Sequence, residues 1–217
     1  MFFENLKKAV FIGAHTDDEM MVAGTLRKLV KVGVDVRVLI FSYAPIPGKT
    51  HQEAAEILRP EFIASMNHIG VRGDNFEVAG LDPRTMPDHQ SQIRQRVYDF
   101  TEKEKPDLAF ILSSTDDHQD HSILGKICQI VMKNRIPNII RCHYPWNFVP
   151  AFCNVVVPLT LDELETKFNV IRVYKSQLFR YDFESIFRSL TDLDGFTTKN
   201  PPAEAFEILR LTVGSRQ

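Results

Sequence analysis

The sequence is poor in cysteine and contains no CxxC pair. Its three cysteines, Cys128, Cys142 and Cys153, are an odd number and all lie in the second half of the chain. This pattern argues against a disulfide framework and against a zinc site built from thiolates. Any metal site in this protein is therefore expected to use nitrogen and oxygen ligands.

Long apolar runs and an excess of charge of one sign are also missing. No uninterrupted apolar run approaches the ~18 residues of a membrane-spanning helix, and the first residues lack the apolar core of a signal peptide. The 26 basic and 28 acidic residues leave a net charge of −2, without the basic excess typical of proteins that bind duplex nucleic acid. We expect a cytoplasmic protein with no membrane span and no nucleic-acid partner.

The hydrophobic pattern predicts alternating strands and helices. Short apolar runs predict strands at 9–14, 34–41, 76–78, 107–112, 139–140 and 152–157. Helical spacing predicts helices at 20–30, 51–69, 89–104, 121–133 and 161–178, with Pro60 expected to kink or restart the second. We expect a surface loop at 192–203 and a last strand or helix at 204–211. This order predicts an α/β sandwich with a mostly parallel sheet.

The length predicts a single domain over residues 1–217. We expect its C-terminal part, from about 145 to 217, to complete the substrate side of the domain. In an open α/β sheet, ligands bind outside the carboxyl ends of the strands, so chemically active residues are expected directly after strands. Two polar clusters occupy such positions.

The first cluster is the segment HTDDE at residues 15–19, directly after the first predicted strand. One interpretation is structural, with Asp17 or Asp18 capping a helix and Glu19 as an acid in its first turn. The other is a metal site, because His15 and Asp18 stand three residues apart on a turn and both suit Zn²⁺. Asp17 would then face a water activated at the metal.

The second cluster is the segment DDHQDH at residues 116–121, directly after the strand predicted at 107–112. His118 and His121 are three residues apart at the start of a helix, so both can project to one side. Asp117 or Asp120 can accept the second N–H of a ligating imidazole. Because parallel strands bring their carboxyl ends to one edge of the sheet, both clusters are expected to form one metal site.

The residue types favour metal-assisted hydrolysis of an amide or ester. Three protein ligands and one open position are typical of catalytic zinc, which generates hydroxide near neutral pH. A spare carboxylate, Asp17, can remove a proton from water and pass it to a leaving amine. A spare histidine, His118, can stabilise the developing oxyanion or act as an acid.

The two clusters resemble the signatures of the LmbE-like/PIG-L family of zinc-dependent N-deacetylases. AHTDDE at residues 14–19 resembles the family's AHPDDE, and HQDH at 118–121 resembles its HPDH. Weaker similarities follow in the family's order, in residues 59–71, 174–177 and 203–206. The resemblance covers roughly residues 8–210 and implies a Rossmann-like three-layer α/β sandwich. It also implies removal of an N-acetyl group, commonly from an N-acetylglucosamine conjugate.

The resemblance also implies roles for individual residues. By position, the zinc ligands would be His15, Asp18 and His121. The catalytic residues would be Asp17 as general base and His118 in the transition state, held by Asp120. Weaker candidates for support or substrate contact are Glu19, Arg59 and, from its place after a strand beside Tyr144 and Trp146, His143.

Five departures from the family's pattern concern the substrate side more than the metal. Thr16 and Gln119 replace prolines, Tyr174 replaces a histidine, and Asp116 stands where some members carry a tyrosine that helps the oxyanion. An ionised acid at position 116 cannot take over that role. The loop at residues 42–48 also differs from the loop common in the family.

Other functions stay open at this point. The first alternative is a metal-dependent hydrolase of esters or non-sugar amides on the same scaffold, and the second is a non-catalytic binding protein. We expect one Zn²⁺ per chain, with Fe²⁺ or Co²⁺ as alternatives. The expected substrate is a small amino-sugar conjugate or a related natural-product intermediate. The identity of that sugar and homo-oligomerisation are not determined by the sequence.

Overall fold

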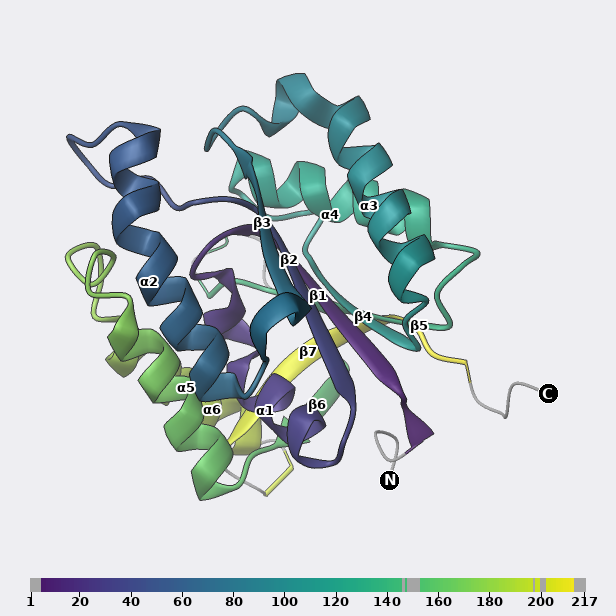
Figure 1. Cartoon of the computed structure of the whole chain (residues 1–217). Helices are drawn as coiled ribbons and strands as arrows, with labels where there is room; N and C mark the ends of the chain where they lie inside the picture. Colours follow the sequence, from purple (N-terminus) through teal and green to yellow (C-terminus); the bar gives the residue numbers. More distant parts are fainter. Residues whose placement is uncertain (1–4, 146, 148–152, 197, 200–201, 213–217) are drawn as a thin grey trace.

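The computed structural model describes residues 5–145, 147, 153–196, 198–199 and 202–212 (Figure 1). Its strands are β1 (Lys8–His15), β2 (Asp35–Ser42), β3 (Phe76–Leu81), β4 (Leu108–Leu112), β5 (Asn138–Cys142), β6 (Val155–Pro158) and β7 (Ala203–Arg210). Its helices are α1 (Ala23–Lys31), α2 (His51–Ile69), α3 (Gln90–Glu104), α4 (Gln119–Met132), α5 (Leu161–Val173) and α6 (Phe183–Phe196). Short 3₁₀ helices are Asp18–Met21, Gly73–Asn75 and Met86–His89. Among the described helices, none is long and apolar enough to cross a membrane.

The strands form one seven-stranded sheet in the order β3-β2-β1-β4-β5-β7-β6. The pairs β1–β2, β2–β3, β1–β4 and β4–β5 are parallel, and β7 runs antiparallel to β5 and β6. Every residue of β4 is buried, as expected for a central parallel strand that is covered on both faces. The predicted mostly parallel sheet is confirmed.

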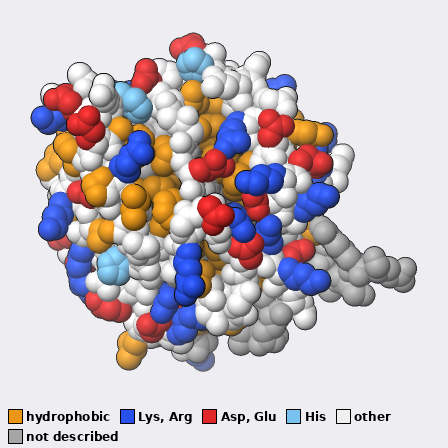
Figure 2. Space-filling view, viewed as in Figure 1, with side chains coloured by type: hydrophobic (Ala, Val, Ile, Leu, Met, Phe, Trp, Pro, Cys, Tyr) orange, Lys and Arg blue, Asp and Glu red, His pale blue; other side chains and the backbone are white. Residues whose placement is uncertain are grey.

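The helices cover both faces of this sheet, which gives three layers. Helices α3 and α4 lie together on one face, and α1, α2, α5 and α6 lie on the other (Figure 1). The predicted Rossmann-like α/β sandwich is therefore confirmed. On the face of the molecule shown in Figure 2, acidic and basic side chains are interspersed.

The strand order places the polar clusters side by side. From β1 the chain moves outward through β2 to β3, and it then returns to place β4 on the other side of β1. This reversal is a topological switch point, where neighbouring loops diverge and leave a crevice for ligands. His15 ends β1, and the cluster at residues 116–121 follows β4. Both clusters therefore reach the same edge of the sheet.

Some helix boundaries differ from the sequence-based expectation. Helix α2 continues through Pro60 as one helix, because Leu58 and Phe62 on either side of the proline are buried against the core. Helix α5 ends at Val173 rather than at 178. Residues 192–196, expected in a loop, belong to α6. Phe152, predicted at the start of a strand, lies outside the described residues, and β6 begins at Val155.

Helix α6 was not predicted, although its pattern is amphipathic. Phe183, Phe187 and Thr191 repeat at intervals of four residues and are buried. They pack this helix beside β7, which forms only after the chain returns to the sheet. The turn-rich composition that follows concealed this spacing.

Candidate metal centre

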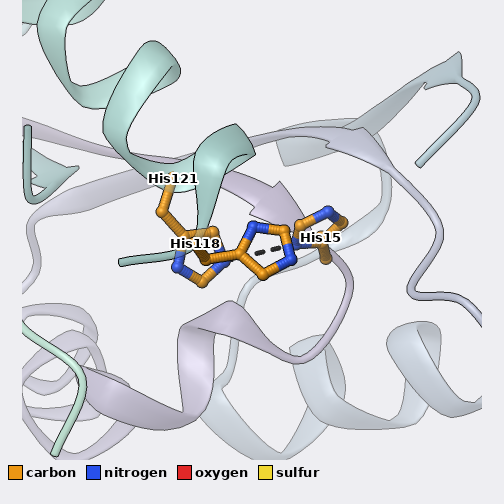
Figure 3. A group of neighbouring side chains, drawn as sticks. All are labelled: His15, His118 and His121. Carbon is orange, nitrogen blue, oxygen red and sulfur yellow. Dashed lines mark hydrogen bonds between the residues drawn. The ribbon is translucent and has the colours of Figure 1, made fainter. Parts of the chain in front are cut away.

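Three histidines from the two clusters converge at the switch point. His15 comes from the end of β1, and His118 and His121 come from the start of α4 (Figure 3). Each offers a ring nitrogen, and these nitrogens lie within 4.8 Å of one another. His15 and His121 are buried and His118 is half-buried. The predicted meeting of the two clusters is therefore observed.

His15 and His121 each turn one ring nitrogen toward the other ring and the second nitrogen toward a carboxylate. Nδ1 of His15 lies 3.3 Å from Nε2 of His121, so these two nitrogens face each other. The outer nitrogen of each ring faces a carboxylate: His15 Nε2 lies 3.1 Å from Asp120 Oδ2, and His121 Nδ1 lies 3.4 Å from Asp116 Oδ2. A carboxylate behind the imidazole is the usual arrangement for a histidine that ligates a metal.

Asp18 adds a carboxylate to this pair. Its Oδ2 accepts hydrogen bonds from the backbone N–H groups of Ala14 at 2.7 Å and His15 at 2.9 Å. Its Oδ1 lies 3.3 Å from His121 Nε2 and accepts a 2.6 Å hydrogen bond from the hydroxyl of Tyr144. The side chain thus points back to the end of β1 instead of capping the helix that follows.

A glycine lets Asp18 take this position. A Cβ on Gly13 would lie 3.2 Å from the Cβ of Asp18 and 2.7 Å from the side chain of Ile40. Both distances are tighter than ordinary van der Waals contact, so a larger residue at position 13 would push the carboxylate away. The small residue near the end of β1 therefore leaves the space that Asp18 occupies beside the histidines.

The separations of these groups fit a tetrahedral metal site. Zinc binds nitrogen and oxygen ligands at about 2.0–2.2 Å, so two ligand atoms of a tetrahedron lie about 3.3–3.6 Å apart. The distances from His121 Nε2 to His15 Nδ1 and to Asp18 Oδ1 are both 3.3 Å. The donor set of two imidazoles and one carboxylate also suits zinc.

The charges of Asp18, Asp116 and His121 shift one another's pKa values. Burial alone would lower the pKa of His121, but the carboxylates of Asp18 and Asp116 raise this pKa to about 10. Burial would raise the pKa of Asp18, yet His121 and His15 hold that pKa below its usual value. The buried carboxylates thus stabilise positive charge between the two rings, as a cation site requires.

His118 differs from the other two histidines in its hydrogen bonding. It is the N-cap of α4, and its Nδ1 accepts a 3.3 Å hydrogen bond from the backbone N–H of Asp120. Burial, together with the nearby His121 and His15, lowers the pKa of His118 to about 4. The ring is therefore neutral near pH 7 and carries its proton on Nε2, where it can donate a hydrogen bond.

Asp17 lines the same cavity and is half-buried. Its backbone has φ of +104°, a conformation that few residues other than glycine adopt. Burial and the adjacent charge of Asp18 raise the pKa of its carboxyl well above the usual value. A raised pKa is typical of a carboxylate that accepts and returns a proton near neutral pH.

Glu19 hydrogen-bonds to the backbone of Asp17. Its Oε2 accepts the backbone N–H of Asp17 at 3.2 Å, and its Oε1 accepts hydrogen bonds from the hydroxyls of Ser65 and Tyr174. Burial raises the pKa of Glu19 despite these hydrogen bonds. Glu19 therefore connects the turn that carries Asp17 to α2 and to the end of α5.

Asp120 lies elsewhere than expected. The resemblance implied that it holds His118, whereas its carboxylate contacts Nε2 of His15 and accepts the backbone N–H of Arg84 at 2.6 Å. Asp120 contacts His118 through its backbone, whose N–H donates a hydrogen bond to Nδ1 of His118. The reason is the capping geometry of α4, which leaves the Asp120 side chain in the first turn free to reach β1.

Arg59 and His143 are outside the group of residues that line the cavity. Arg59 is exposed on α2, with its guanidinium 5.9 Å from the ring centre of Tyr43. His143 follows β5, and its Nε2 lies 3.2 Å from Oε2 of Glu207 on β7. Trp146, expected beside His143, lies outside the described residues.

The sequence pattern did not indicate a role for Tyr144 or the contacts of Asp116. The ring of Tyr144 stacks on His121 at 4.8 Å between ring centres, and its hydroxyl holds Asp18. Asp116 accepts the backbone N–H of His118 at 2.8 Å and contacts His121. The signal that could have identified both is their place just after β5 and β4, at the same edge of the sheet as His15.

Comparison with known proteins agrees with this site. The family model PIG-L, described as GlcNAc-PI de-N-acetylase, matches residues 10–132, a stretch that includes both clusters. No curated protein matches the sequence.

Solved structures with the same fold have diverse activities. An N,N'-diacetylchitobiose deacetylase from Pyrococcus horikoshii, solved with an inhibitor, is 22% identical with a TM-score of 0.81, covering 96% of this chain and 85% of that chain. The zinc-inhibited form of teicoplanin deacetylase Orf2 is 14% identical with a TM-score of 0.73, covering 95% and 100%. GalB, the 4-carboxy-2-hydroxymuconate hydratase from Pseudomonas putida KT2440, is 14% identical with a TM-score of 0.77, covering 97% and 99%. Identities this low show a shared fold alone.

Proposed function

Since this chain belongs to the PIG-L (LmbE-like) family, we propose that it is a zinc-dependent hydrolase that removes the acetyl group from an N-acetyl amino sugar. The observation that carries the proposal is the arrangement of His15, Asp18 and His121. Nε2 of His121 lies 3.3 Å from Nδ1 of His15 and 3.3 Å from Oδ1 of Asp18. Both histidines have a carboxylate behind the ring. No carboxylate of the described residues lies behind the His118 ring in this way, and His118 is proposed to stay outside the ligand set.

A zinc ion held by these three side chains would polarise the acetyl carbonyl and make a water molecule acidic enough to attack it near neutral pH. Asp17, with its raised pKa, accepts the proton of that water and returns it to the departing amine nitrogen. His118 donates its Nε2 proton in a hydrogen bond to the carbonyl oxygen as negative charge develops there. Glu19 and Asp120 position this machinery, since they hold the backbone of Asp17 and the ring of His15.

The cavity over the cluster suits a small polar substrate. It has a volume of about 330 Å³, near the lower end of the range of about 300–1,000 Å³ for small-molecule sites. Two of the three structural neighbours described above are named as deacetylases, one of them for a disaccharide. The family description names an N-acetylglucosamine lipid as substrate. An N-acetyl amino sugar is the substrate class common to the family description and the chitobiose deacetylase.

A hydratase is the second candidate, because the Pseudomonas hydratase has the same fold over 97% of this chain. A hydratase adds water to a carbon–carbon double bond and releases no acetate. Hydrolysis of a non-acetyl amide or of an ester would also release no acetate from an N-acetyl sugar. One assay therefore separates these reactions from deacetylation.

The test is a screen for acetate and free amine over a panel of N-acetyl sugars, with the purified protein before and after chelation. We expect equal amounts of acetate and amine from at least one sugar, loss of the activity with the chelator, and its return with zinc. Acetate release that survives complete removal of metal would contradict the mechanism. No acetate from any N-acetyl sugar, with a metal-loaded protein, would contradict the deacetylase itself.

A further inference from the structure

The cavity contains two arginines in addition to the residues already described. Arg84 comes from the loop after β3, and Arg180 comes from the segment between α5 and α6. The rest of the wall includes the prolines of the loop after β2 and the aromatic start of α6: Pro45, Pro47, Tyr181, Phe183 and Phe187. The two arginines thus approach the metal cluster from separate parts of the chain.

Arg180 has partners within the protein. Its guanidinium donates a hydrogen bond to the backbone oxygen of Pro45 and lies 5.7 Å from the ring centre of Phe179. Its charge also opposes the effects of burial and of Asp18 that raise the pKa of Asp17. Arg180 therefore has a role in the loop and in the electrostatics of Asp17.

Among the residues that the structure describes, the partners of Arg84 contact its backbone. Its N–H donates to Asp120 Oδ2 at 2.6 Å, and its carbonyl accepts from Gln119 Nε2 at 2.8 Å. The same Asp120 oxygen contacts Nε2 of His15 at 3.1 Å. One carboxylate oxygen therefore sets both the His15 ring and the position from which the Arg84 side chain starts.

The backbone of Arg84 adopts a conformation that favours glycine. Its φ is +68°, in the left-handed region that residues with a Cβ seldom occupy. Such residues are concentrated at ligand-binding sites, where surrounding contacts hold them in place. Here those contacts are the two backbone hydrogen bonds to α4. The residue held in this conformation is an arginine that lines the cavity, where a glycine would be easier to accommodate.

The guanidinium of Arg84 has no hydrogen bond or ion pair with any group in the part of the chain that the structure describes. The buried acids of the cavity do not need it. Asp18 accepts hydrogen bonds from two backbone N–H groups and from Tyr144. Oδ2 of Asp120 contacts His15 and the Arg84 backbone, and Asp120 makes no ion pair with the Arg84 guanidinium. The charge of Arg84 is therefore available to a ligand in the cavity.

We propose that Arg84 binds an anionic group of the substrate, a carboxylate or a phosphate, and that the enzyme selects N-acetyl amino sugars carrying such a group; the substrate class rests on the deacetylase function proposed above. A guanidinium presents paired N–H donors whose spacing matches two oxygens of either anion. The anion lies at the rim of the cavity while the acetamide lies at the metal cluster. Arg84 is thus a specificity-determining residue that takes no part in the proton transfers.

The test compares one neutral and two charged substrates. Methyl N-acetylglucosaminide is neutral, N-acetylglucosamine 1-phosphate carries a phosphate, and N-acetylmuramic acid carries a carboxylate. Acetate release is measured with the wild type, Arg84→Gln, Arg84→Lys and the control Arg94→Gln. Arg94 is exposed on α3 and does not line the cavity, so its substitution removes the same charge without touching the site.

We expect the wild type to prefer at least one charged sugar, and which one identifies the anion. In Arg84→Gln, the ratio of kcat/KM for that sugar to kcat/KM for the neutral sugar falls about 10- to 100-fold, the effect of losing a charge-assisted hydrogen bond. The loss appears in KM rather than kcat. Arg84→Lys retains part of the preference because the charge stays while the paired donors are lost, and Arg94→Gln leaves the ratio unchanged.

A calorimetric titration with the same three sugars separates the two proposals. Weaker binding of the charged sugar to Arg84→Gln, without acetate from any sugar, supports the anion site and contradicts the deacetylase. Acetate release with equal kcat/KM for neutral and charged sugars supports the deacetylase and overturns the role of Arg84. An equal loss with Arg94→Gln also overturns it, since a general effect of net charge would then explain the result.

Discussion

The hydroxyl of Tyr144 donates a 2.6 Å hydrogen bond to Oδ1 of Asp18, a residue 126 positions earlier in the chain. The same oxygen lies 3.3 Å from Nε2 of His121, and the tyrosine ring stacks on the His121 ring with an angle of 18° between the planes. Tyr144 therefore contacts two of the three proposed zinc ligands at once. It orients one by a hydrogen bond and the other by packing.

Replacement of Tyr144 by phenylalanine tests this contact. Tyr144→Phe keeps the ring against His121 and removes the donor to Asp18, so we expect zinc affinity to fall about 10- to 100-fold, as for other groups that orient a metal ligand. Competition with a chromogenic chelator measures the affinity. Tyr98→Phe, at an exposed position on α3, is the matched control. Unchanged affinity in Tyr144→Phe would mean that Asp18 needs no such support.

Single alanine substitutions of the histidines distinguish two ligand sets. If zinc is bound by His15, Asp18 and His121, then His121→Ala loses the metal, while His118→Ala retains close to one zinc per chain and loses activity. If the three histidines form the set instead, both variants lose the metal. Metal analysis of the purified variants gives the answer, with His68→Ala on α2 as the control, because His68 is exposed and remote from the cluster.

Substitution of Asp17 tests the proposed base. Asp17→Asn retains the shape and the metal ligands but cannot accept a proton, so we expect zinc content to be unchanged and kcat to fall about 10²- to 10⁴-fold. Steady-state acetate release and metal analysis are measured on the same preparation. Asp88→Asn, at an exposed position in the 3₁₀ helix before α3, should behave as wild type. A fully active Asp17→Asn would show that another group removes the proton.

A buried ion pair between α5 and β7, next to the 3₁₀ helix Asp18–Met21, is expected to be important for stability. Lys167 Nζ contacts Glu204 Oε1 at 2.7 Å and donates to the backbone oxygens of Met20 at 2.6 Å and Met21 at 3.0 Å. Lys167→Met leaves the Glu204 carboxylate buried without its cation, and we expect a loss of about 3–5 kcal/mol in the free energy of unfolding. Chemical denaturation measures this loss.

A second substitution separates the ion pair from packing. The double variant Lys167→Met with Glu204→Gln removes the uncompensated charge and should recover part of the lost stability. Lys175→Met, at an exposed position, should change stability by less than about 0.5 kcal/mol. A double variant less stable than Lys167→Met alone would show that Glu204 is held mainly by Gly24 and Thr25, whose N–H groups it also accepts.

Gly125 sets how closely α4 approaches the end of β4. A Cβ at this position would lie 2.5 Å from the backbone oxygen of Leu112 and 2.8 Å from the backbone carbon of Ser113. Gly125→Ala should therefore lower the free energy of unfolding by about 1–3 kcal/mol, as expected for overpacking. It should also weaken zinc binding, because α4 carries His121. Lys126→Ala, exposed on the next position of the helix, provides the control.

Much of the fold could be predicted because its signals are local. The buried strands and the helices between them follow from hydrophobic spacing within a few residues. The terminal helix α6 was missed, since its buried Phe183 and Phe187 are meaningful only with β7 beside them. Pro60 likewise lies within one helix because burial of its neighbours outweighs the local preference.

The sequence by itself determined where the chemistry lies. His15, Asp18 and His121 stand directly after two apolar strands, and parallel pairing brings the ends of such strands together, so the meeting of the clusters could be expected from pattern alone. Only the tertiary structure decided which atoms face one another: that Asp120 contacts His15, that Tyr144 holds Asp18, and that Arg84 faces the cavity. The physical reason is that these contacts depend on strand order, helix approach and side-chain direction, which no local pattern encodes.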